Sequence, residues 1–591
     1  MTRLWNVPDD FADEMLEGFA AACGRWVRQV PGGVVRSTRD PQPTVSVVIG
    51  GGSGHYPAFG GLVGPGLAHG AAMGNLFSSP SARQVESVVR ASDQGKGVLL
   101  SYGNYAGDVL HFGAAQEALR ADGVDCRTVL VTDDIFSAPA RHTAQRRGIA
   151  GDFAVFKIAG AAAAAGYDLD AVETVTERAN LHTRSMGVAF SGCSLPGAPE
   201  PLFTVPPGRM AIGLGIHGEP GIDEVEMPTA DGLAELFIEQ LLAADETPPA
   251  TGPGGGRIVP ILNGLGSVKN EELFVVYRRI AELLHGAGLV VTDPHVGEYC
   301  TSFDMAGVSL TLLWLDDELE RLWAAPADTP AFRTGAVDTA ALRPFIAEHA
   351  QADAETPPES SEASRRLAAR IASALDAAFI AIDAASDDLG RIDAVAGDGD
   401  HGIGMRRGTR AAAKAAANAV SRSCGAETAL DTAADAWSDK AGGASGALWA
   451  VILRAIGREF GDTKEPTTRD LVRGLNRAVS DVTAYGQAAV GDKTLVDALV
   501  PLAHTFSAAV EAGETLASGW AKAAAAATTS ANATANLLPH RGRARTHGER
   551  SLGTPDPGAV SLAIIAHAVG PHAVGPHTIE RCVAPTTSHT L

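Results

Sequence analysis

One short acidic loop holds the residues best suited to chemistry. Asp393, Asp398 and Asp400 stand within a stretch of eight residues, with glycines between them that permit a tight backbone path. Unpaired carboxylates this close repel one another, so the folded loop needs a cation or a dense set of hydrogen-bond donors. Oxygen ligands suit a hard ion such as Mg²⁺ or Ca²⁺, although the spacing is not that of an EF-hand. The loop predicts a metal site, and a solvated acidic turn is the alternative.

A second candidate follows a strand signal. The β-branched run Thr44–Ile49 leads into Gly50-Gly51-Gly52-Ser53-Gly54-His55. Glycine-rich turns after strands let backbone N–H groups approach a ligand closely. The run is neither a dinucleotide-binding fingerprint nor a P-loop, because no Gly-Lys-Ser/Thr follows. It is either a ligand-binding turn or a plain strand-to-helix turn with a half-exposed histidine.

Two more polar side chains follow strand signals. Asp108 comes after the run Val98–Leu100, where α/β sheets place ligand groups, although an N-cap aspartate is equally common there. His217 lies among glycines after the predicted strand Met210–Ile216, so neighbouring side chains cover it little. This setting favours an acid, a base or a nucleophile, and a structural histidine is the alternative.

The elements that must position these residues fall into distinct regions. Strand and helix signals alternate over 1–188 and again over 189–323, which predicts two α/β domains, with one long helix over 156–179. Residues 324–361 are rich in Pro, Ala, Asp, Glu, Thr and Ser and are predicted to form a linker. Over 362–591 apolar residues recur at helical spacing and strand signals are almost absent, which predicts an all-helical domain.

Composition excludes several classes of function. The 591 residues include 47 Lys+Arg and 69 Asp+Glu, a formal charge of −22, which argues against a nucleic-acid surface. A polyanionic ligand would need metal ions or helix N-termini to bind such a chain. We expect no signal peptide and no membrane span, because the N-terminus lacks an apolar core and no apolar run is long enough. Six scattered cysteines without a C-x-x-C motif fit the reducing cytoplasm.

Taken together, these stretches resemble one family, the ATP-dependent dihydroxyacetone kinases in their fused single-chain form. The resemblance covers nearly the whole chain. It rests on GGGSGH (50–55), GNYAGD (103–108), GIAGDFAVFKIAGA (148–161), GIHGEPG (215–221), AGDGDHG (396–402), GGASGALWA (442–450), GDKTLVDAL (491–499) and GRARTHGERSLGTPDPGA (542–559). Each motif alone is only moderately specific, but their number and order identify the family.

The resemblance implies a ketone-binding half made of two α/β domains. There His217 attacks the ketone carbon and forms a covalent hemiaminal, while His55 and Asp108 handle the proton of the substrate hydroxyl. The loop Gly52-Ser53-Gly54-His55 lines the substrate pocket. The substrate is thus a small ketose, and neither nucleic acid nor a membrane is a partner.

The resemblance also implies that the helical half is an eight-helix barrel that binds ATP, with Asp393, Asp398 and Asp400 holding two Mg²⁺ ions. Metal ions and positioning are what phosphoryl transfer most needs. The implied nucleotide contacts are His401, Gly402, Ile403, Gly404, Ala444, Ser445, Gly486, Leu495, Arg543, Asp556, Pro557 and Gly558. For Leu495 a plain core position is the alternative, and for Arg543 a solvated basic face.

Departures from the family pattern concern the substrate. Many members have a lysine where this chain has Gly103, and a glutamate where it has Tyr56. A glycine makes room for one more hydroxymethyl group, so we favour erythrulose, of either enantiomer, over dihydroxyacetone. A non-catalytic ketone-sensing regulator and an FAD-cyclising lyase that uses Mn²⁺ are the other hypotheses. The family also suggests a homodimer in which the helical domain of one chain covers the substrate half of the other.

Overall fold

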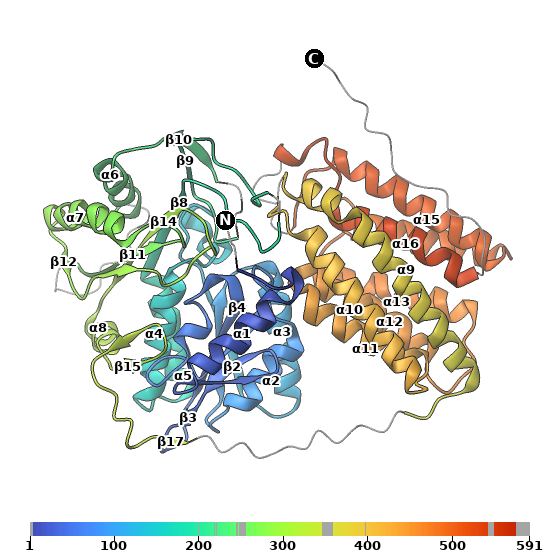
Figure 1. Cartoon of the computed structure of the whole chain (residues 1–591), viewed down its shortest axis with the longest axis horizontal. Helices are drawn as coiled ribbons and strands as arrows, with labels where there is room; N and C mark the ends of the chain where they lie inside the picture. The colour runs from blue at the N-terminus through green and yellow to red at the C-terminus, as the bar shows by residue number, and fades with distance from the viewer. Residues whose placement is uncertain are drawn as a thin grey trace.

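The computed structural model places an α/β half beside a helical half (Figure 1). It describes residues 4–574 except 199, 218, 220, 244–245, 247–255, 345–357, 396 and 542–548. The α/β half runs from blue to green in Figure 1 and the helical half from yellow to red. The predicted fold class, α/β followed by all-α, is confirmed.

The first sheet is covered by helices on both faces. Its strands, in spatial order, are Val27–Val30 (β1), Gly33–Arg36 (β2), Gly70–Gly74 (β5), Ser46–Gly52 (β4), Val98–Gly103 (β6) and Cys126–Val131 (β7). The four strands from β5 to β7 run parallel, so β4 and β6 end at the same edge. This brings the segments after Gly52 and Gly103 to one place, where α/β sheets bind ligands.

The helices of this domain form two layers. They are Phe11–Ala22 (α1), Ala82–Ser92 (α2), Ala106–Ala121 (α3), Gly151–Ala164 (α4) and Leu169–Leu181 (α5). Val47 and Ile49 of β4 pack on the α4 and α5 side, whereas Val48 between them packs on the α2 and α3 side. A strand buried on both faces accounts for the consecutive apolar residues Val47, Val48 and Ile49.

The single helix predicted over 156–179 is wrong, because α4 and α5 are separate helices. Gly166 adopts a φ of 84°, which turns the chain. The Asp168 side chain then caps α5 by accepting a hydrogen bond from the Ala171 N–H. Apolar spacing continues across such a break, so periodicity alone does not reveal it.

The second sheet is mostly antiparallel at its centre. Its strands are Asp223–Glu226 (β10), Arg209–Ile212 (β9), Thr183–Ala189 (β8), Gly307–Trp314 (β14), Arg257–Gly264 (β11) and Val290–Val291 (β12), with His295–Gly297 (β13) also beside β11. Ala230–Leu241 (α6) and Asn270–Gly286 (α7) pack on it, and Asp317–Trp323 (α8) follows β14. The strand predicted over 210–216 ends at Ile212, because Gly213 turns the chain with a φ of 75° toward His217. The predicted boundary at 188/189 falls inside β8 and stays a prediction.

Part of the predicted linker packs on the α/β half. Ala327–Asp328 (β15) pairs with Arg333–Thr334 (β16), and Arg343–Pro344 (β17) pairs with Thr38–Arg39 (β3). Phe332 is buried in the core of the first domain. Residues 324–344 therefore do not form a free spacer.

Eight helices form the helical half within the described residues. They are Glu362–Asp393 (α9), His401–Ser421 (α10), Ala426–Ala441 (α11), Gly443–Phe460 (α12), Thr468–Gly486 (α13), Val496–Glu511 (α14), Leu516–Ala533 (α15) and Pro557–Val574 (α16). Each helix packs against the next, and α16 packs back against α9, which closes a ring. The ring encloses an apolar cavity of about 310 Å³.

The remaining helical turns are short. They are Pro8–Asp10 (η1), Ser53–His55 (η2), Gly60–Leu62 (η3), Ala140–Gln145 (η4) and Thr534–Asn536 (η5). None of the helices in the described residues combines the length and apolarity required to cross a bilayer.

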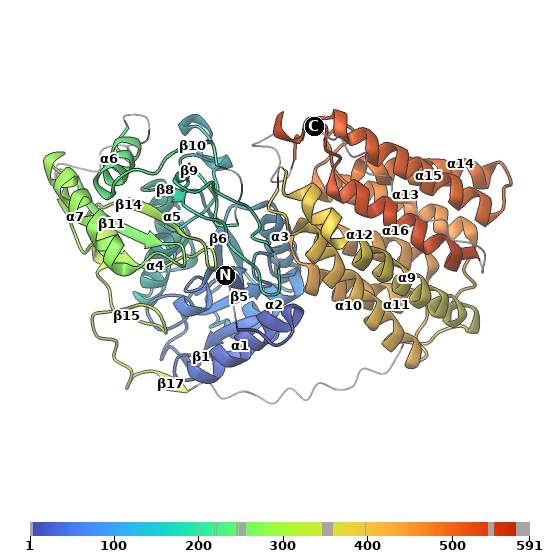
Figure 2. The same cartoon turned by 45° about the horizontal axis from the view of Figure 1, so that its top comes forward.

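The two halves meet where α3 lies beside α12 (Figures 1 and 2). His111 Nε2 lies 2.9 Å from the carbonyl oxygen of Gly443, and the Tyr485 hydroxyl donates to the carbonyl oxygen of Leu110 at 2.7 Å. A Cβ on Gly107 would lie only 2.9 Å from Gly443 Cα. Backbones this close require glycine and hold the start of α3 against the helical half.

Candidate active site

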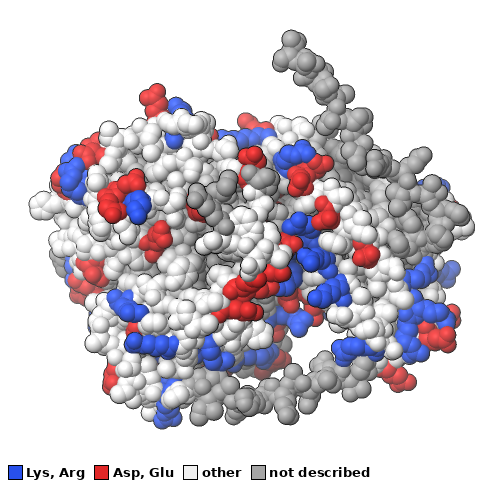
Figure 3. All heavy atoms as spheres, in the orientation of Figure 1, with Lys and Arg blue, Asp and Glu red and all other residues white. Residues whose placement is uncertain are grey.

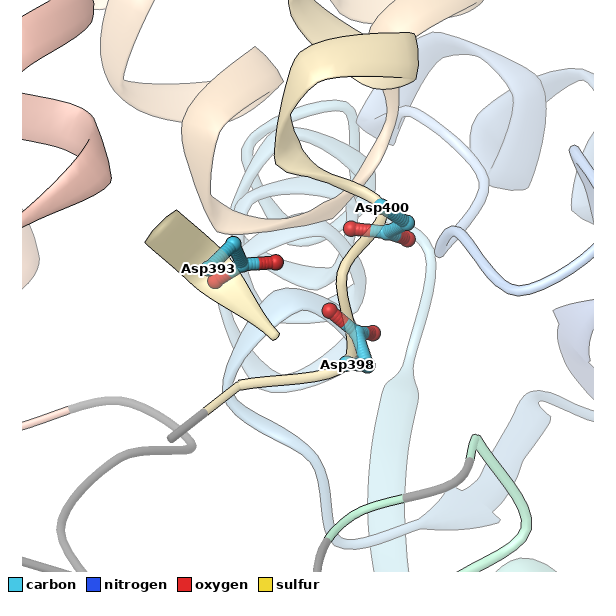
Figure 4. Close-up of side chains that lie close together, drawn as sticks. All are labelled: Asp393, Asp398 and Asp400. Atoms are coloured by element: carbon cyan, nitrogen blue, oxygen red, sulfur yellow. The ribbon is translucent and has the colours of Figure 1, made fainter. Parts of the chain in front are cut away.

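Three carboxylates converge between α9 and α10. Asp393 is the last residue of α9, Asp398 lies in the following loop, and Asp400 is the N-cap of α10. One oxygen from each lies within 4.8 Å of the others, and Figure 4 shows the three side chains around a common space. Burial, and then the nearby Asp393 carboxylate, raises the pKa of Asp400. An all-oxygen site with this repulsion fits Mg²⁺, which would hold all three carboxylates in their charged form.

A cavity of about 240 Å³ opens beside the triad. Most of the predicted nucleotide contacts line it: His401, Gly404, Ala444, Ser445, Leu495, Asp556, Pro557 and Gly558. The helices α10, α12 and α16 all begin at this cavity. Helix N-termini attract phosphate, which is how an acidic chain can hold a nucleotide.

The remaining predicted contacts lie elsewhere. Gly402 packs against α9, where a Cβ would lie 1.9 Å from Ser386 O, and Ile403 packs against the α/β half. Gly486 ends α13 behind Leu448, which lines the cavity. Arg543 lies outside the described residues. For these four positions a nucleotide contact stays a prediction.

His55 and His217 lie in direct contact although 162 positions separate them. Their Nε2 atoms are 3.0 Å apart, and both residues are buried. His55 ends η2 directly after β4, and His217 follows the turn after β9. The histidine pair therefore needs both sheets, because the glycine-rich turn of the first sheet carries His55 and the turn after β9 of the second sheet carries His217.

The hydrogen-bond partners of the two Nδ1 atoms determine which ring nitrogens of His55 and His217 carry hydrogen. His55 Nδ1 lies 2.8 Å from the carbonyl oxygen of Thr301, which can only accept, so Nδ1 carries the hydrogen. His217 Nδ1 lies 3.0 Å from Glu219 Oε1, and Arg147 at 3.9 Å favours the ionised form of that carboxylate. His217 Nδ1 therefore also donates. A hydrogen bond between the two Nε2 atoms then requires one more proton, shared by the pair and balanced by Glu219.

Asp108 follows the short segment at the start of α3 that contacts both the histidine pair and the cavity. It sits in the first turn of α3 and is buried, whereas the N-cap of that helix is Tyr105. The Tyr105 ring packs edge-on against His217 with centroids 4.5 Å apart. Ala106 and Gly107 line the cavity beside the triad. The first turn of α3 thus reaches both places, and the alternative of an N-cap role for Asp108 is wrong.

Comparison with known proteins agrees with this arrangement. Residues 17–331 match the Dak1 domain and residues 395–570 match the DAK2 domain. The chain is 57% identical to the L-erythrulose kinase of Pectobacterium atrosepticum over 96% of each chain. It is 50% identical to the D-erythrulose kinase of Mycolicibacterium smegmatis over 96% of this chain and 97% of that protein. The chain belongs to the dihydroxyacetone kinase family.

A solved structure of the family carries a nucleotide and a metal. The dihydroxyacetone kinase of C. freundii, in complex with AMP-PNP and Mg²⁺, is 28% identical to this chain and has a TM-score of 0.51. The match covers 96% of this chain and 99% of that one. The present chain, as a member of the dihydroxyacetone kinase family, uses ATP and Mg²⁺, as predicted.

Sequence reasoning gave no role to several residues that shape this dihydroxyacetone kinase site. Glu219 and Tyr105 orient His217, and the carbonyl of Thr301 orients His55. Lys493 lines the nucleotide cavity, with its Nζ donating to the carbonyl oxygen of Ser551 at 2.7 Å. Glu219, Tyr105 and Lys493 stand inside the motifs that carried the resemblance, which was the available signal. A backbone carbonyl such as that of Thr301 leaves no trace in the residue type.

Proposed function

We propose that this member of the dihydroxyacetone kinase family transfers the γ-phosphoryl group of ATP to a primary hydroxyl of erythrulose, in preference to dihydroxyacetone. The observation that carries the proposal is the first turn of α3, which joins the His55–His217 pair to the cavity beside the aspartate triad. The enzyme is a phosphotransferase with an alcohol acceptor, and its substrate is a short ketose.

Two observations support erythrulose over dihydroxyacetone. The two relatives described above with 57% and 50% identity are erythrulose kinases and are similar over nearly their whole length. A Cβ at Gly103 would lie 3.2 Å from the Tyr105 ring, which itself packs against His217, so a larger side chain would crowd this wall of the site. Glycine leaves that wall of the site in place. The two relatives act on opposite enantiomers, so the enantiomer is a matter for the assay.

The histidine pair can form and stabilise an adduct with the ketone. With the shared proton on His55, His217 Nε2 presents its lone pair to the carbonyl carbon. A C–N bond forms, the carbonyl π bond breaks toward oxygen, and that oxygen takes the proton from His55 Nε2. The product is a hemiaminal with a neutral hydroxyl. The alkylated His217 ring keeps its Nδ1 hydrogen and is an imidazolium, whose positive charge Glu219 balances.

Asp108, buried in the first turn of α3, would accept the proton of the hydroxyl that attacks phosphorus. Mg²⁺ at Asp393, Asp398 and Asp400 would neutralise the nucleotide phosphates. The chain itself supplies orientation: His217 would hold the ketose, and three helix N-termini face the cavity. Covalent attachment selects carbonyl compounds and excludes glycerol.

The activity test is a panel of acceptors. Purified protein with ATP and Mg²⁺ is offered dihydroxyacetone, D-erythrulose, L-erythrulose, glyceraldehyde and glycerol, and both ADP and the phosphorylated product are measured. We expect the highest kcat/KM with one erythrulose and none with glycerol, and EDTA should abolish turnover until Mg²⁺ is restored. Turnover with glycerol alone, or with no acceptor, would refute a carbonyl-dependent kinase.

A homodimer is part of the proposal. In the structure α12 covers α3 of the same chain, and two chains could exchange this contact while each site stays the same. Light scattering tests the dimer. Mixing His217→Ala and Asp398→Asn chains tests the exchange, since activity returns only if halves of different chains meet.

We also place the enzyme in the cytoplasm, because the five cysteines within the described residues are free thiols.

A further inference from the structure

We propose that the N-terminal segment Pro8–Ala22 is an electrostatic latch, in which Asp9 holds the metal-binding helix α10 in register with the ketose site. The inference rests on the proposed function, since it concerns transfer between the two halves. Asp9 is a positioning residue, distant in sequence from every residue assigned a role above.

The centre of the latch is one carboxylate among three arginines. Asp9 Oδ1 accepts from Arg406 Nη2 at 2.7 Å and from Arg407 Nε at 3.3 Å, and Asp9 Oδ2 accepts from Arg410 Nη1 at 3.3 Å. Arg407 also donates to the carbonyl oxygen of Pro8 at 3.3 Å. The side chains of Asp9 and Arg407 are only 16% and 12% exposed, so solvent screens this pair less than a surface pair.

Electrostatics strengthens this contact. Burial alone would raise the pKa of Asp9, but Arg406 and Arg407 lower it, so the carboxylate is charged. Figure 3 shows acidic and basic side chains facing one another at the boundary between the two halves. Asp13 adds a second tie to Lys440 of the helical half at 2.6 Å, although both of these side chains are about half exposed.

The helical end of the latch is rigidly joined to the metal loop. The three arginines project from α10, the helix whose N-cap is Asp400 and whose first residue is His401. Arg407 also attracts the Asp400 carboxylate across this part of the helix. A helix is rigid along its axis. The ion pairs of Asp9 with Arg406, Arg407 and Arg410 therefore fix the position of the aspartate triad at the N-terminal end of α10.

The other end of the latch lies along the ketose-binding loop. Phe11, Met15 and Phe19 of α1 line a cavity of about 450 Å³ together with Ser53 and Gly54. Phe19 also packs edge-on against Tyr56, next to His55, with ring centroids 5.8 Å apart. One short segment therefore touches both the loop that carries His55 and the helix that carries Asp400.

In-line phosphoryl transfer is sensitive to the position of the ketose site relative to the metal-binding helix α10. A misplacement of about 1 Å by a change far from the chemistry can cost about 100-fold in rate. Loss of the latch should therefore impair transfer while each half still binds its own ligand.

The test compares Asp9→Asn with Asp10→Asn, a neighbouring exposed aspartate whose side chain makes no cap hydrogen bond. We expect Asp9→Asn to lower kcat for ketose phosphorylation about tenfold or more, and Asp10→Asn to change it less than twofold. Asp9→Glu should recover part of the loss. Mn²⁺ binding to the triad and ketose binding, measured separately, should be unchanged in Asp9→Asn.

A measurement that needs no activity separates this inference from the proposed function. Amide hydrogen exchange in 106–111 and 443–448, where the halves meet, should be faster in Asp9→Asn than in Asp10→Asn. Equal kcat and equal exchange in the two variants would overturn the latch. So would loss of Mn²⁺ or ketose binding in Asp9→Asn, which would indicate a purely structural role. A wild type inactive on every ketose, with exchange still faster in Asp9→Asn, would refute the kinase and retain the latch.

Discussion

The histidine pair shows how three neighbouring groups hold the ring that we propose as the nucleophile. His217 is held through Nδ1 by Glu219, through its ring face by Tyr105, and through Nε2 by His55. Glu219 contributes twice, because its other oxygen accepts from the backbone N–H of His217 at 3.1 Å. A carboxylate in this position favours the extra proton that the pair needs in order to protonate the ketone oxygen.

The first prediction concerns the charge of Glu219. Glu219→Gln keeps an acceptor for His217 Nδ1 but removes the negative charge, so we expect kcat/KM for the ketose to fall by about 100-fold. Steady-state kinetics at saturating ATP measures it, with Glu224→Gln, an exposed position on β10, as the control. If Glu219→Gln and the control behave alike, the shared proton does not contribute to the reaction.

Among the elements, α10 packs very closely against its neighbour α11. It presents Gly408 to Trp437 of α11, where a Cβ would lie 2.4 Å from the indole ring. Trp437 in turn stacks on Trp449 of α12 with centroids 4.7 Å apart. A glycine here costs some helix propensity, and in exchange α10 approaches α11 closely enough for the ring of helices to close.

The second prediction tests this close approach. Gly408→Ala should lower the free energy of unfolding of the helical half by about 1–3 kcal/mol, because the added methyl overpacks the core. Gly404→Ala on the same helix is the matched control, since its Cβ would meet only Ala441 O at 3.7 Å. Chemical denaturation followed by tryptophan fluorescence compares them. A stability of Gly408→Ala equal to that of Gly404→Ala would show that α10 can shift at no cost.

For the whole molecule, the contact between the halves is as important as either half. The α/β half carries the His55–His217 pair and the helical half carries the cavity beside the aspartate triad, and α3 against α12 joins the two. This contact contains a buried titratable group, His111. Burial lowers the pKa of His111 to about 4, although its hydrogen bond to the carbonyl oxygen of Gly443 acts in the opposite direction.

The third prediction follows from the sign of that shift. The folded pKa lies below the ordinary value of 6.5, so the unfolded chain takes up the proton first as the pH falls. Stability is therefore lost from about pH 6.5 downward, and by pH 5 the loss from this group is about 2 kcal/mol. His111→Gln keeps a donor for Gly443 O but cannot titrate. The drop in unfolding free energy between pH 7 and pH 5 should be about 2 kcal/mol smaller in this variant, and an equal drop would contradict the assignment.

Local spacing in the sequence determined the fold class, most helices and the gathering of Asp393, Asp398 and Asp400, because each depends on residues close together in the chain. It did not reveal the break at Gly166, since apolar periodicity runs through a turn that a single glycine φ decides. The sequence likewise did not predict that Tyr105 is the N-cap of α3, because several residues in that stretch can begin a helix.

Only the tertiary structure decided which distant groups meet. His55 and His217 come from different sheets, Glu219 and Thr301 orient them, and Asp9 reaches arginines some 400 positions away. The motifs named the chemistry that each stretch can perform, because residue type limits chemistry. Which stretch acts on which is decided by the packing of whole domains, and no local pattern encodes that packing.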